Sequence, residues 1–226
     1  MVKEVVVLSL GGSLVSTAGG IDAGFLGEFR DFVLKGCERR RFIIVVGGGK
    51  VARDYQAAEK ITKLGDGEKD WIGIYATWLN AELVRALFGK QAHKKIGSDP
   101  DEKLDFKEDI LVAGGWEPGF STDYDSVLWA KRFGAKRLVN MSDVDYVYDK
   151  DPKKHSDSKP IEKISWKEFR KIVGNEWKPG SRLPFDPVAA REAERLGMKV
   201  MVLNGRDLGN VGKCIDGKSF KGTVVS

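Results

Sequence analysis

The chain has 226 residues and carries 38 lysines and arginines against 33 aspartates and glutamates, a formal net charge of +5. A hydrophobic content of 42% and a charged content of 31% are typical of a folded soluble protein and exclude intrinsic disorder. Two cysteines and two histidines exclude a disulfide framework, a cysteine-rich zinc site and most histidine metal sites. With so few cysteines, a reducing cytoplasm is the simplest compartment. No apolar run reaches the ~18 residues of a membrane helix, so we expect no transmembrane segment and no membrane partner.

The positive charge points to small anions as partners. The basic residues form only short clusters, at Arg39, Arg40 and Arg41, at Lys94 and Lys95, and at Lys153 and Lys154, each expected in a loop or at a helix end. No nucleic-acid-binding motif accompanies them. The sequence therefore favours phosphate-bearing small molecules over nucleic acid.

Glycine is abundant, with 27 residues, and much of it follows predicted strands. Buried strands are predicted at residues 4–9, 42–46 and 109–113. They lead into the glycine loops Gly11-Gly12-Ser13, Gly47-Gly48-Gly49 and Gly114-Gly115. Amphipathic helices are expected over residues 22–38, 50–64, 70–88 and 122–133. The helix over 22–38, capped by Asp22, is the one that follows Gly11-Gly12-Ser13, so it begins well after its glycine loop.

The second half continues the alternation. Strands are predicted at residues 137–141, 198–203 and 223–225, the last at the edge of the sheet. Helices are expected over residues 165–173, 186–196 and 207–215, with a capping box at Ser165 and Glu168 and a helix start at Asp186-Pro187. A turn or hairpin is expected within 143–152, and polar loops over 153–160 and 174–185.

Strands alternating with helices predict an α/β fold with a mainly parallel sheet. Ligands of such sheets bind at the carboxyl ends of the strands, where the three glycine loops lie. Glycine there lets backbone N–H groups approach an anion, and a following helix N-terminus adds a favourable dipole. Each loop alone can be only a tight turn, but three at one edge favour phosphate binding. The motifs GxxxxGK[ST] and GxGxxG are absent, so neither a Walker-type ATPase nor a Rossmann dehydrogenase is expected.

These residues, in this order, resemble the amino acid kinase superfamily and, within it, the archaeal type of UMP kinase. The matching segments are Leu10-Gly11-Gly12-Ser13, Val46-Gly47-Gly48-Gly49-Lys50 with Arg53, Asp70 with Gly73-Ile74, Thr77 and Asn80, Gly114-Gly115 with Pro118-Gly119 and Thr122-Asp123, Val144-Asp145 with Val147-Tyr148 and Asp151-Pro152, and Asp186-Pro187 with Ala189-Ala190. The resemblance implies a three-layer αβα sandwich similar to carbamate kinase, in one domain of residues 1–226. Its acceptor lobe would span about 1–134 and its ATP lobe about 135–226.

The same resemblance implies transfer of the ATP γ-phosphoryl to UMP, with Mg²⁺ brought by ATP, no metal site on the protein, and a hexamer built as a trimer of dimers. It assigns catalytic positions to Asp186, Arg53 and Lys50. ATP binding is assigned to Ser9, Gly11, Gly12, Ser13, Gly48, Arg53, Asn140, Asp143, Tyr148 and Asp151. UMP binding is assigned to Gly47, Gly48, Asp70, Glu117, Pro118, Gly119, Phe120, Ser121, Thr122 and Asp123.

Several of these residues also have simpler interpretations. Arg53 and Lys50 can be solvated surface residues, and the aspartates of 143–151 can be turn residues. Asp70, Thr122 and Asp186 can serve as helix N-caps, alone or in addition to a ligand role.

The chain departs from the family pattern at four places. Ser9 stands where many members have lysine, as in the archaeal branch; transition-state charge then falls to Mg²⁺, Arg53, Lys50, Lys178 or Arg182. Tyr146 replaces a small residue beside the expected adenine site, and Trp78 stands where arginine is common, on the helix expected at a dimer contact. Trp116-Glu117 places a carboxylate beside an anionic acceptor, which is unexpected unless it faces solvent.

Two alternatives remain open at this point. One is a sister kinase for another acceptor, such as isopentenyl phosphate or an amino acid, although the histidine that isoprenoid kinases place after the GGG loop is absent. The other is a nucleotide-binding sensor or storage protein without turnover, which the departures at Ser9, Tyr146 and Glu117 keep open.

Overall fold

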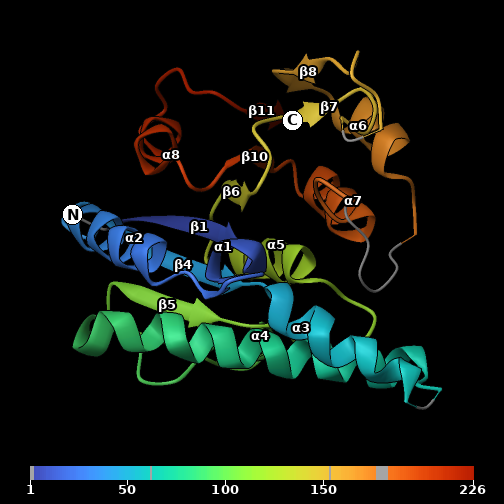
Figure 1. Ribbon diagram of the computed structural model, residues 1–226. Helices are drawn as coiled ribbons and strands as arrows, with labels where there is room; N and C mark the ends of the chain where they lie inside the picture. Colours follow the sequence, from blue (N-terminus) through green and yellow to red (C-terminus); the bar gives the residue numbers. More distant parts are fainter. Residues whose placement is uncertain (1–2, 62, 153, 177–182) are drawn as a thin grey trace.

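A computed structural model describes residues 3–61, 63–152, 154–176 and 183–226 (Figure 1). A seven-stranded sheet runs through it in the order β5-β4-β1-β6-β10-β11-β9. Its strands are β1 (Glu4–Leu10), β4 (Arg40–Val46), β5 (Ile110–Ala113), β6 (Arg137–Ser142), β9 (Lys163–Ile164), β10 (Lys199–Asn204) and β11 (Thr223–Val225). Every neighbouring pair is parallel except β10 and β11, so the prediction of a mainly parallel sheet is confirmed.

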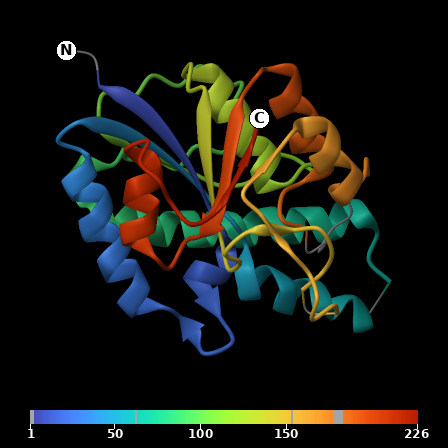
Figure 2. The same ribbon diagram turned by 90° about the horizontal axis from the view of Figure 1, so that it is seen from above.

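Helices cover both faces of this sheet. One layer contains α1 (Gly12–Val15), α2 (Ala23–Gly36), α4 (Asp66–Phe88) and α8 (Leu208–Ile215). The other contains α5 (Thr122–Arg132), α6 (Trp166–Val173) and α7 (Pro187–Arg195). Figure 2 shows the strands fanned between the α2 and α8 side and the α6 and α7 side. This is the expected three-layer αβα sandwich.

The alternation of side chains along the strands explains the two cores. Val6, Leu8 and Leu10 of β1 face the layer of α1, α2, α4 and α8, whereas Val7 faces the layer of α5, α6 and α7. Successive side chains of a strand point to opposite faces, and both faces of a parallel sheet are covered. Hence the apolar runs Val5–Leu8 of β1 and Phe42–Val46 of β4 are continuous in sequence and do not alternate with polar residues.

Smaller elements complete the chain. They are β2 (Ser16–Thr17) paired with β3 (Gly20–Ile21), β7 (Val147–Tyr148) paired with β8 (Pro160–Ile161), α3 (Gly49–Gln56), and the 3₁₀ turns η1 (Ala57–Lys60) and η2 (Gly89–Gln91). β7 pairs with β8, so this strand pairing reaches beyond residues 143–152, within which a turn or hairpin was expected. No helix in the described ranges combines the length and the apolar character needed to cross a bilayer.

Several features differ from the predictions. The helix expected over residues 50–64 is shorter, because α3 ends at Gln56 and the 3₁₀ turn η1 follows it. The first glycine loop leads directly into α1 at Gly12, whereas its helix was expected only later. The long helix begins at Asp66, because Gly65 is its N-cap and the Glu68 carboxylate accepts the Gly65 N–H at 2.7 Å. The last strand is not at the edge, since β9 pairs outside β11. Arg40 and Arg41 lie within β4 and not in a loop or at a helix end.

Candidate active site

The first two glycine loops touch each other backbone to backbone. They follow β1 and β4, which are adjacent parallel strands, so both loops lie at the same edge. A Cβ added to Gly12 would lie 2.1 Å from the Gly49 nitrogen and 2.6 Å from the Gly47 carbonyl carbon. Gly49 also has a φ of +61°, a left-handed conformation that suits glycine. Glycine is therefore required here because no side chain fits between the loops.

Helix α4 packs against the second glycine loop and fixes it through hydrogen bonds from Asn80. The Asn80 side-chain amide donates to the Gly47 carbonyl at 2.9 Å and to the Gly48 carbonyl at 3.0 Å. Asn80 is buried, so these two bonds satisfy an amide that water cannot reach. The result is that the Gly48 and Gly49 N–H groups, at the start of α3, keep their place at the strand edge.

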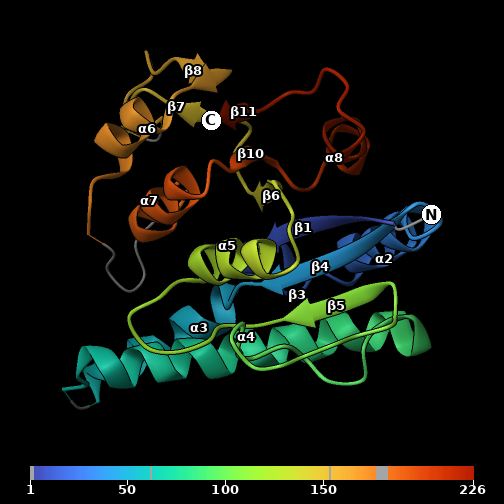
Figure 3. The same ribbon diagram turned by 180° about the vertical axis from the view of Figure 1, so that it is seen from behind.

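The third loop rests on the same helix. Gly115 donates its N–H to Thr77 Oγ1 at 2.7 Å, and the Trp78 indole N–H donates to the Gly115 carbonyl at 2.7 Å. Further along, Gly119 donates its N–H to Asp70 Oδ2 at 2.8 Å. Figure 3 shows the segment after β5 passing beside α4 before α5 begins. One helix thus positions both the second and the third glycine loop.

Three buried or half-buried carboxyl groups lie close together, and one of them, that of Asp123, contacts Ser9. The Ser9 hydroxyl donates to Asp123 Oδ1 at 3.1 Å, and the Asp186 backbone N–H donates to Asp123 Oδ2 at 3.1 Å. Desolvation, reinforced by the nearby Asp186 charge, raises the pKa of Asp123 to about 7. Burial also raises the pKa of Asp186. The pair therefore resists carrying two negative charges near neutral pH unless a cation joins it.

Asp125 is the third carboxyl of this group and lies two residues after Asp123 in α5. It is buried, and neither of its oxygens has a hydrogen-bond partner in the described part of the chain. Burial, reinforced by the nearby Asp123 and Asp186 charges, raises its pKa well above the usual range. An isolated buried carboxylate is costly, so the fold disfavours the charged form of Asp125.

The two carboxylate oxygens of Asp186 have different surroundings: one caps a helix and the other has no hydrogen-bond partner among the described residues. Its Oδ1 accepts the Ala189 N–H at 2.7 Å, so it caps α7, and Pro187 occupies the first helical position as expected. Its Oδ2 is buried and has no partner among the described residues. The capping interpretation is thus correct for Asp186 and leaves one oxygen for a ligand.

The capping interpretation is wrong for two other residues. Asp70 lies one turn inside α4, which Gly65 caps, and its burial raises its pKa. Thr122 is the first residue of α5, but the N-cap is Ser121, whose hydroxyl accepts the Tyr124 N–H at 3.3 Å. Capping therefore does not explain the presence of Asp70 or Thr122.

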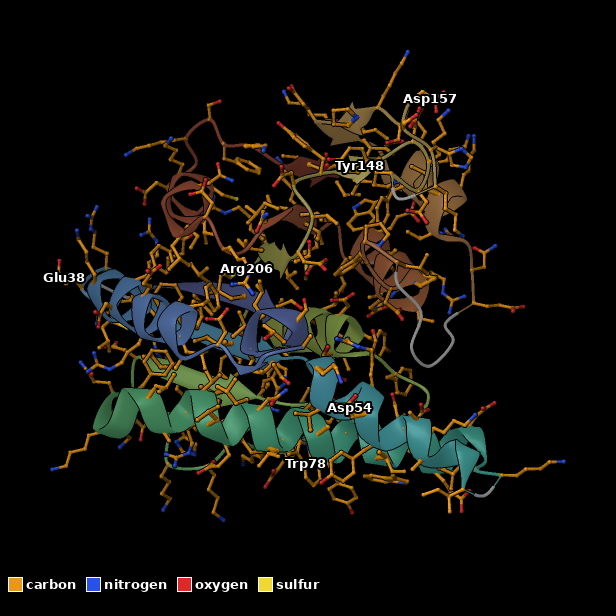
Figure 4. All side chains as sticks on the ribbon, viewed as in Figure 1. Glu38, Asp54, Trp78, Tyr148, Asp157 and Arg206 are labelled. Atoms are coloured by element: carbon orange, nitrogen blue, oxygen red, sulfur yellow. The ribbon has the colours of Figure 1, made fainter. Side chains whose placement is uncertain are left out.

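The two cations assigned to catalysis lie on α3. Lys50 forms an ion pair with Asp54, one turn further along the helix. Arg53 is exposed, and no hydrogen bond or ion pair links its guanidinium to the residues that the structure describes. Figure 4 labels Asp54 on α3, above α4, which carries Trp78. Lys178 and Arg182 fall outside the described residues.

The other residues assigned to ATP lie within and after β6, in the C-terminal half. Asn140 is buried and donates to the Pro184 carbonyl at 2.9 Å, and Asp143 is exposed. The rings of Tyr146 and Tyr148 meet edge to face, with centroids 6.5 Å apart. Asp151 lies 3.9 Å from the Lys154 ammonium. The first loop reaches this region, because Gly11 donates its N–H to the Met141 carbonyl at 2.9 Å.

Some backbone donors assigned to phosphates are used inside the fold. The Gly11 N–H bonds Met141, and the Gly47 N–H bonds the Leu10 carbonyl at 3.0 Å. The first N–H groups of a helix have no intrahelical partner, which leaves those of Gly12 and Ser13 in α1. Gly12 and Ser13 are thus better placed than Gly11 to donate to an anion.

The acceptor loop has an aromatic character that the family pattern does not predict. The rings of Trp116, Phe120 and Tyr124 stack in a row, with interplanar angles of 15° and 14°. Glu117 is exposed, so its carboxylate meets solvent. Pro118 is half-buried, and Gly119 has a φ of +93° that favours glycine.

Three residues important for the arrangement had no role assigned from the sequence: Thr77, Trp78 and Asn80. Thr77 and Asn80 are buried polar residues on the sheet-facing side of α4. Polar residues on the apolar face of a predicted helix were the available signal, since buried polar groups need partners.

A cavity of about 430 Å³ lies at the opposite end of the strands, lined by Lys3, Phe133 and Arg137 among others, and none of the assigned residues lines it.

Comparison with known proteins agrees with this geometry. The model of the amino acid kinase family matches residues 4–204. Uridylate kinase of Methanobrevibacter smithii is 32% identical over 224 residues, covering 98% of this chain and 99% of that protein. Uridylate kinase of Pyrococcus abyssi is 35% identical over 223 residues, covering 97% of this chain and 98% of that protein.

Solved structures agree as well. The crystal structure of uridylate kinase from Archaeoglobus fulgidus superimposes with a TM-score of 0.85 at 32% identity, covering 99% of this chain and 100% of that one. UMP kinase from Bacillus anthracis has a TM-score of 0.78 at 20% identity, which shows the shared fold. The chain therefore belongs to the amino acid kinase family, in which it is similar to archaeal uridylate kinases along nearly its whole length.

Proposed function

We propose that the protein is an ATP-dependent kinase that transfers the γ-phosphoryl group of ATP to UMP, giving ADP and UDP for pyrimidine nucleotide biosynthesis. The observation that carries this is the direct packing of the Gly12 and Gly47–Gly49 backbones at one strand edge. Two phosphorylated substrates have to meet in line, and two donor-lined loops in contact suit that requirement.

The acceptor side follows from α4 and the third loop. Asp70 is held against Gly119 through Oδ2, while no hydrogen bond from the described residues reaches its Oδ1, which we assign to a ribose hydroxyl of UMP. Thr122, Asp123 and the residues 117–121 would surround the nucleotide, and Arg53 would bind its phosphate bidentately. UMP already has an ionised phosphate, so the reaction needs no strong base.

The donor side follows from β6 and β7. Gly12, Ser13 and Gly48 would bind ATP phosphates through backbone N–H groups, and Tyr148 would offer its ring to adenine, with Asn140, Asp143 and Asp151 nearby. Mg²⁺ would arrive chelated by the phosphates, as is usual for this ion. The chemistry of the buried Asp186 Oδ2 fits an ion or its bound water, and the ion would supply neutralisation of phosphate charge.

We also propose a homo-oligomer, a hexamer built as a trimer of dimers. Trp71, Tyr75 and Leu79 are exposed along α4, with 41%, 60% and 64% of their surface accessible. Adjacent exposed apolar side chains of this size are typical of a protein contact. Light scattering on the purified protein tests this, and a monomer with no concentration dependence would refute it.

The activity is tested by ADP release with UMP, CMP, dUMP and isopentenyl phosphate as acceptors. We expect turnover that is fastest with UMP. Preferred turnover of isopentenyl phosphate would replace the proposal by a sister kinase. ATP binding without turnover of any acceptor would make the protein a nucleotide sensor.

A further inference from the structure

The side chain of Trp78 contacts both another aromatic residue of α4 and the third glycine loop. Its ring meets Tyr75 edge to face, with centroids 5.2 Å apart, while its indole N–H bonds the Gly115 carbonyl at 2.7 Å. A Cβ added to Gly114 would lie 2.6 Å from Trp78 Cδ1, so the indole packs directly against the loop backbone. Figure 4 labels Trp78 on α4, far from Tyr148 on the ATP side.

Both polar groups of Gly115 are held by α4. The Gly115 N–H donates to the Thr77 hydroxyl, and the Gly115 carbonyl accepts the Trp78 indole N–H. A glycine otherwise has the widest backbone freedom of any residue, so two bonds to neighbouring helical positions remove much of it. With Gly119 bound to Asp70, the loop is held at both ends by one helix.

We propose that Trp78 is a positioning residue for the acceptor: its indole N–H fixes the Gly115 carbonyl and so sets the conformation of the loop that receives UMP. The proposal rests on the function proposed above and adds to it a residue that acts through the loop. Among the described residues, the Trp78 indole N–H bonds this acceptor loop, whereas the adenosine part of ATP is assigned to residues in and after β6. We therefore expect Trp78 to influence UMP more than ATP.

The test is Trp78→Phe, which keeps an aromatic ring against Tyr75 and removes the N–H donor. Trp166→Phe is a matched control, because the Trp166 indole N–H also bonds a backbone carbonyl, that of Met198 at 3.0 Å, in the other helical layer. Steady-state kinetics with each substrate and hydrogen exchange of the amides in 115–119 are measured for both variants.

We expect Trp78→Phe to raise the KM for UMP by roughly three- to tenfold, the effect of one net hydrogen bond. The KM for ATP should not change, and the loop amides should exchange faster in the free protein. Trp166→Phe should lower the Tm without either effect.

Unchanged exchange of the 115–119 amides in Trp78→Phe would overturn the positioning role, whether or not UMP is a substrate. So would an equal rise in both KM values, or a rise in the KM for UMP in Trp166→Phe. A wild-type protein that does not phosphorylate UMP would instead refute the proposed function, so the two failures are distinguishable.

Discussion

Replacing Gly12 by alanine tests the contact between the two glycine loops. The new Cβ would lie 2.1 Å from the Gly49 nitrogen and 2.6 Å from the Gly47 carbonyl, where an ordinary contact begins at 3.4 Å. The obstacle is backbone on both sides, so no side chain can rotate away. One of the loops must move by more than about 1 Å, which is the scale on which misplaced groups lose ~100-fold in rate.

The cost in stability follows from overpacking of a filled site. Inserting one methyl group typically costs about 1–3 kcal/mol, and a chain of this size loses roughly 2–4 °C of Tm for each kcal/mol. We therefore expect Gly12→Ala to lower the Tm by roughly 2–12 °C and kcat/KM for UMP by about two orders of magnitude. Thermal unfolding followed by circular dichroism and the ADP-release assay measure the two effects.

Gly27→Ala is the matched control. Gly27 lies within α2, and its added Cβ would meet no atom within 4 Å. Alanine is favoured over glycine in a helix by about 0.5–1 kcal/mol, so this variant should be slightly more stable and equally active. A Gly12→Ala protein with wild-type Tm and wild-type kinetics would refute the close packing of the loops.

Three further changes test the other parts of the site. Arg53→Ala should raise the KM for UMP and lower kcat, because a phosphate loses its bidentate partner; unchanged kinetics would remove Arg53 from the site. Asp186→Asn should cut turnover while retaining the α7 cap, since an amide oxygen can still accept the Ala189 N–H; loss of the fold, seen as a lost unfolding transition, would assign Asp186 a capping role alone. Asp123 has a folded pKa of about 7, above its unfolded value near 3.9, so its contribution to stability is full below pH 4 and is lost as pH rises towards 7. Urea unfolding of Asp123→Asn across this range should lack that decline, which amounts to at most about 1.4 kcal/mol per pH unit; an identical slope in both proteins would contradict the raised pKa.

Local patterns in the sequence were enough to predict most of the elements. Runs such as residues 42–46 are too short and too β-branched for a helix, and Asp22, Ser165 and Asp186 mark helix starts by the chemistry of their side chains. The start of α4 was predicted too late because its first turn is polar, and periodicity of apolar residues carries no signal there.

The order of the strands in the sheet could not be predicted from those local sequence patterns. The edge position belongs to β9, a two-residue strand that pairs with β11 about 60 residues further along the chain. Such pairing depends on which surfaces meet in the folded chain, and two residues carry no periodicity of their own.

The sequence by itself determined that glycine follows β1, β4 and β5, and that parallel strands place those glycines at one edge. Only the tertiary structure decided which of their amides are free, because Gly11 and Gly47 use theirs within the fold. It also decided that Thr77, Trp78 and Asn80 hold the loops, since a hydrogen bond between residues over 30 positions apart depends on how a helix packs under a sheet. The chemistry of the loops is therefore local in origin, and their positions are set by long-range packing.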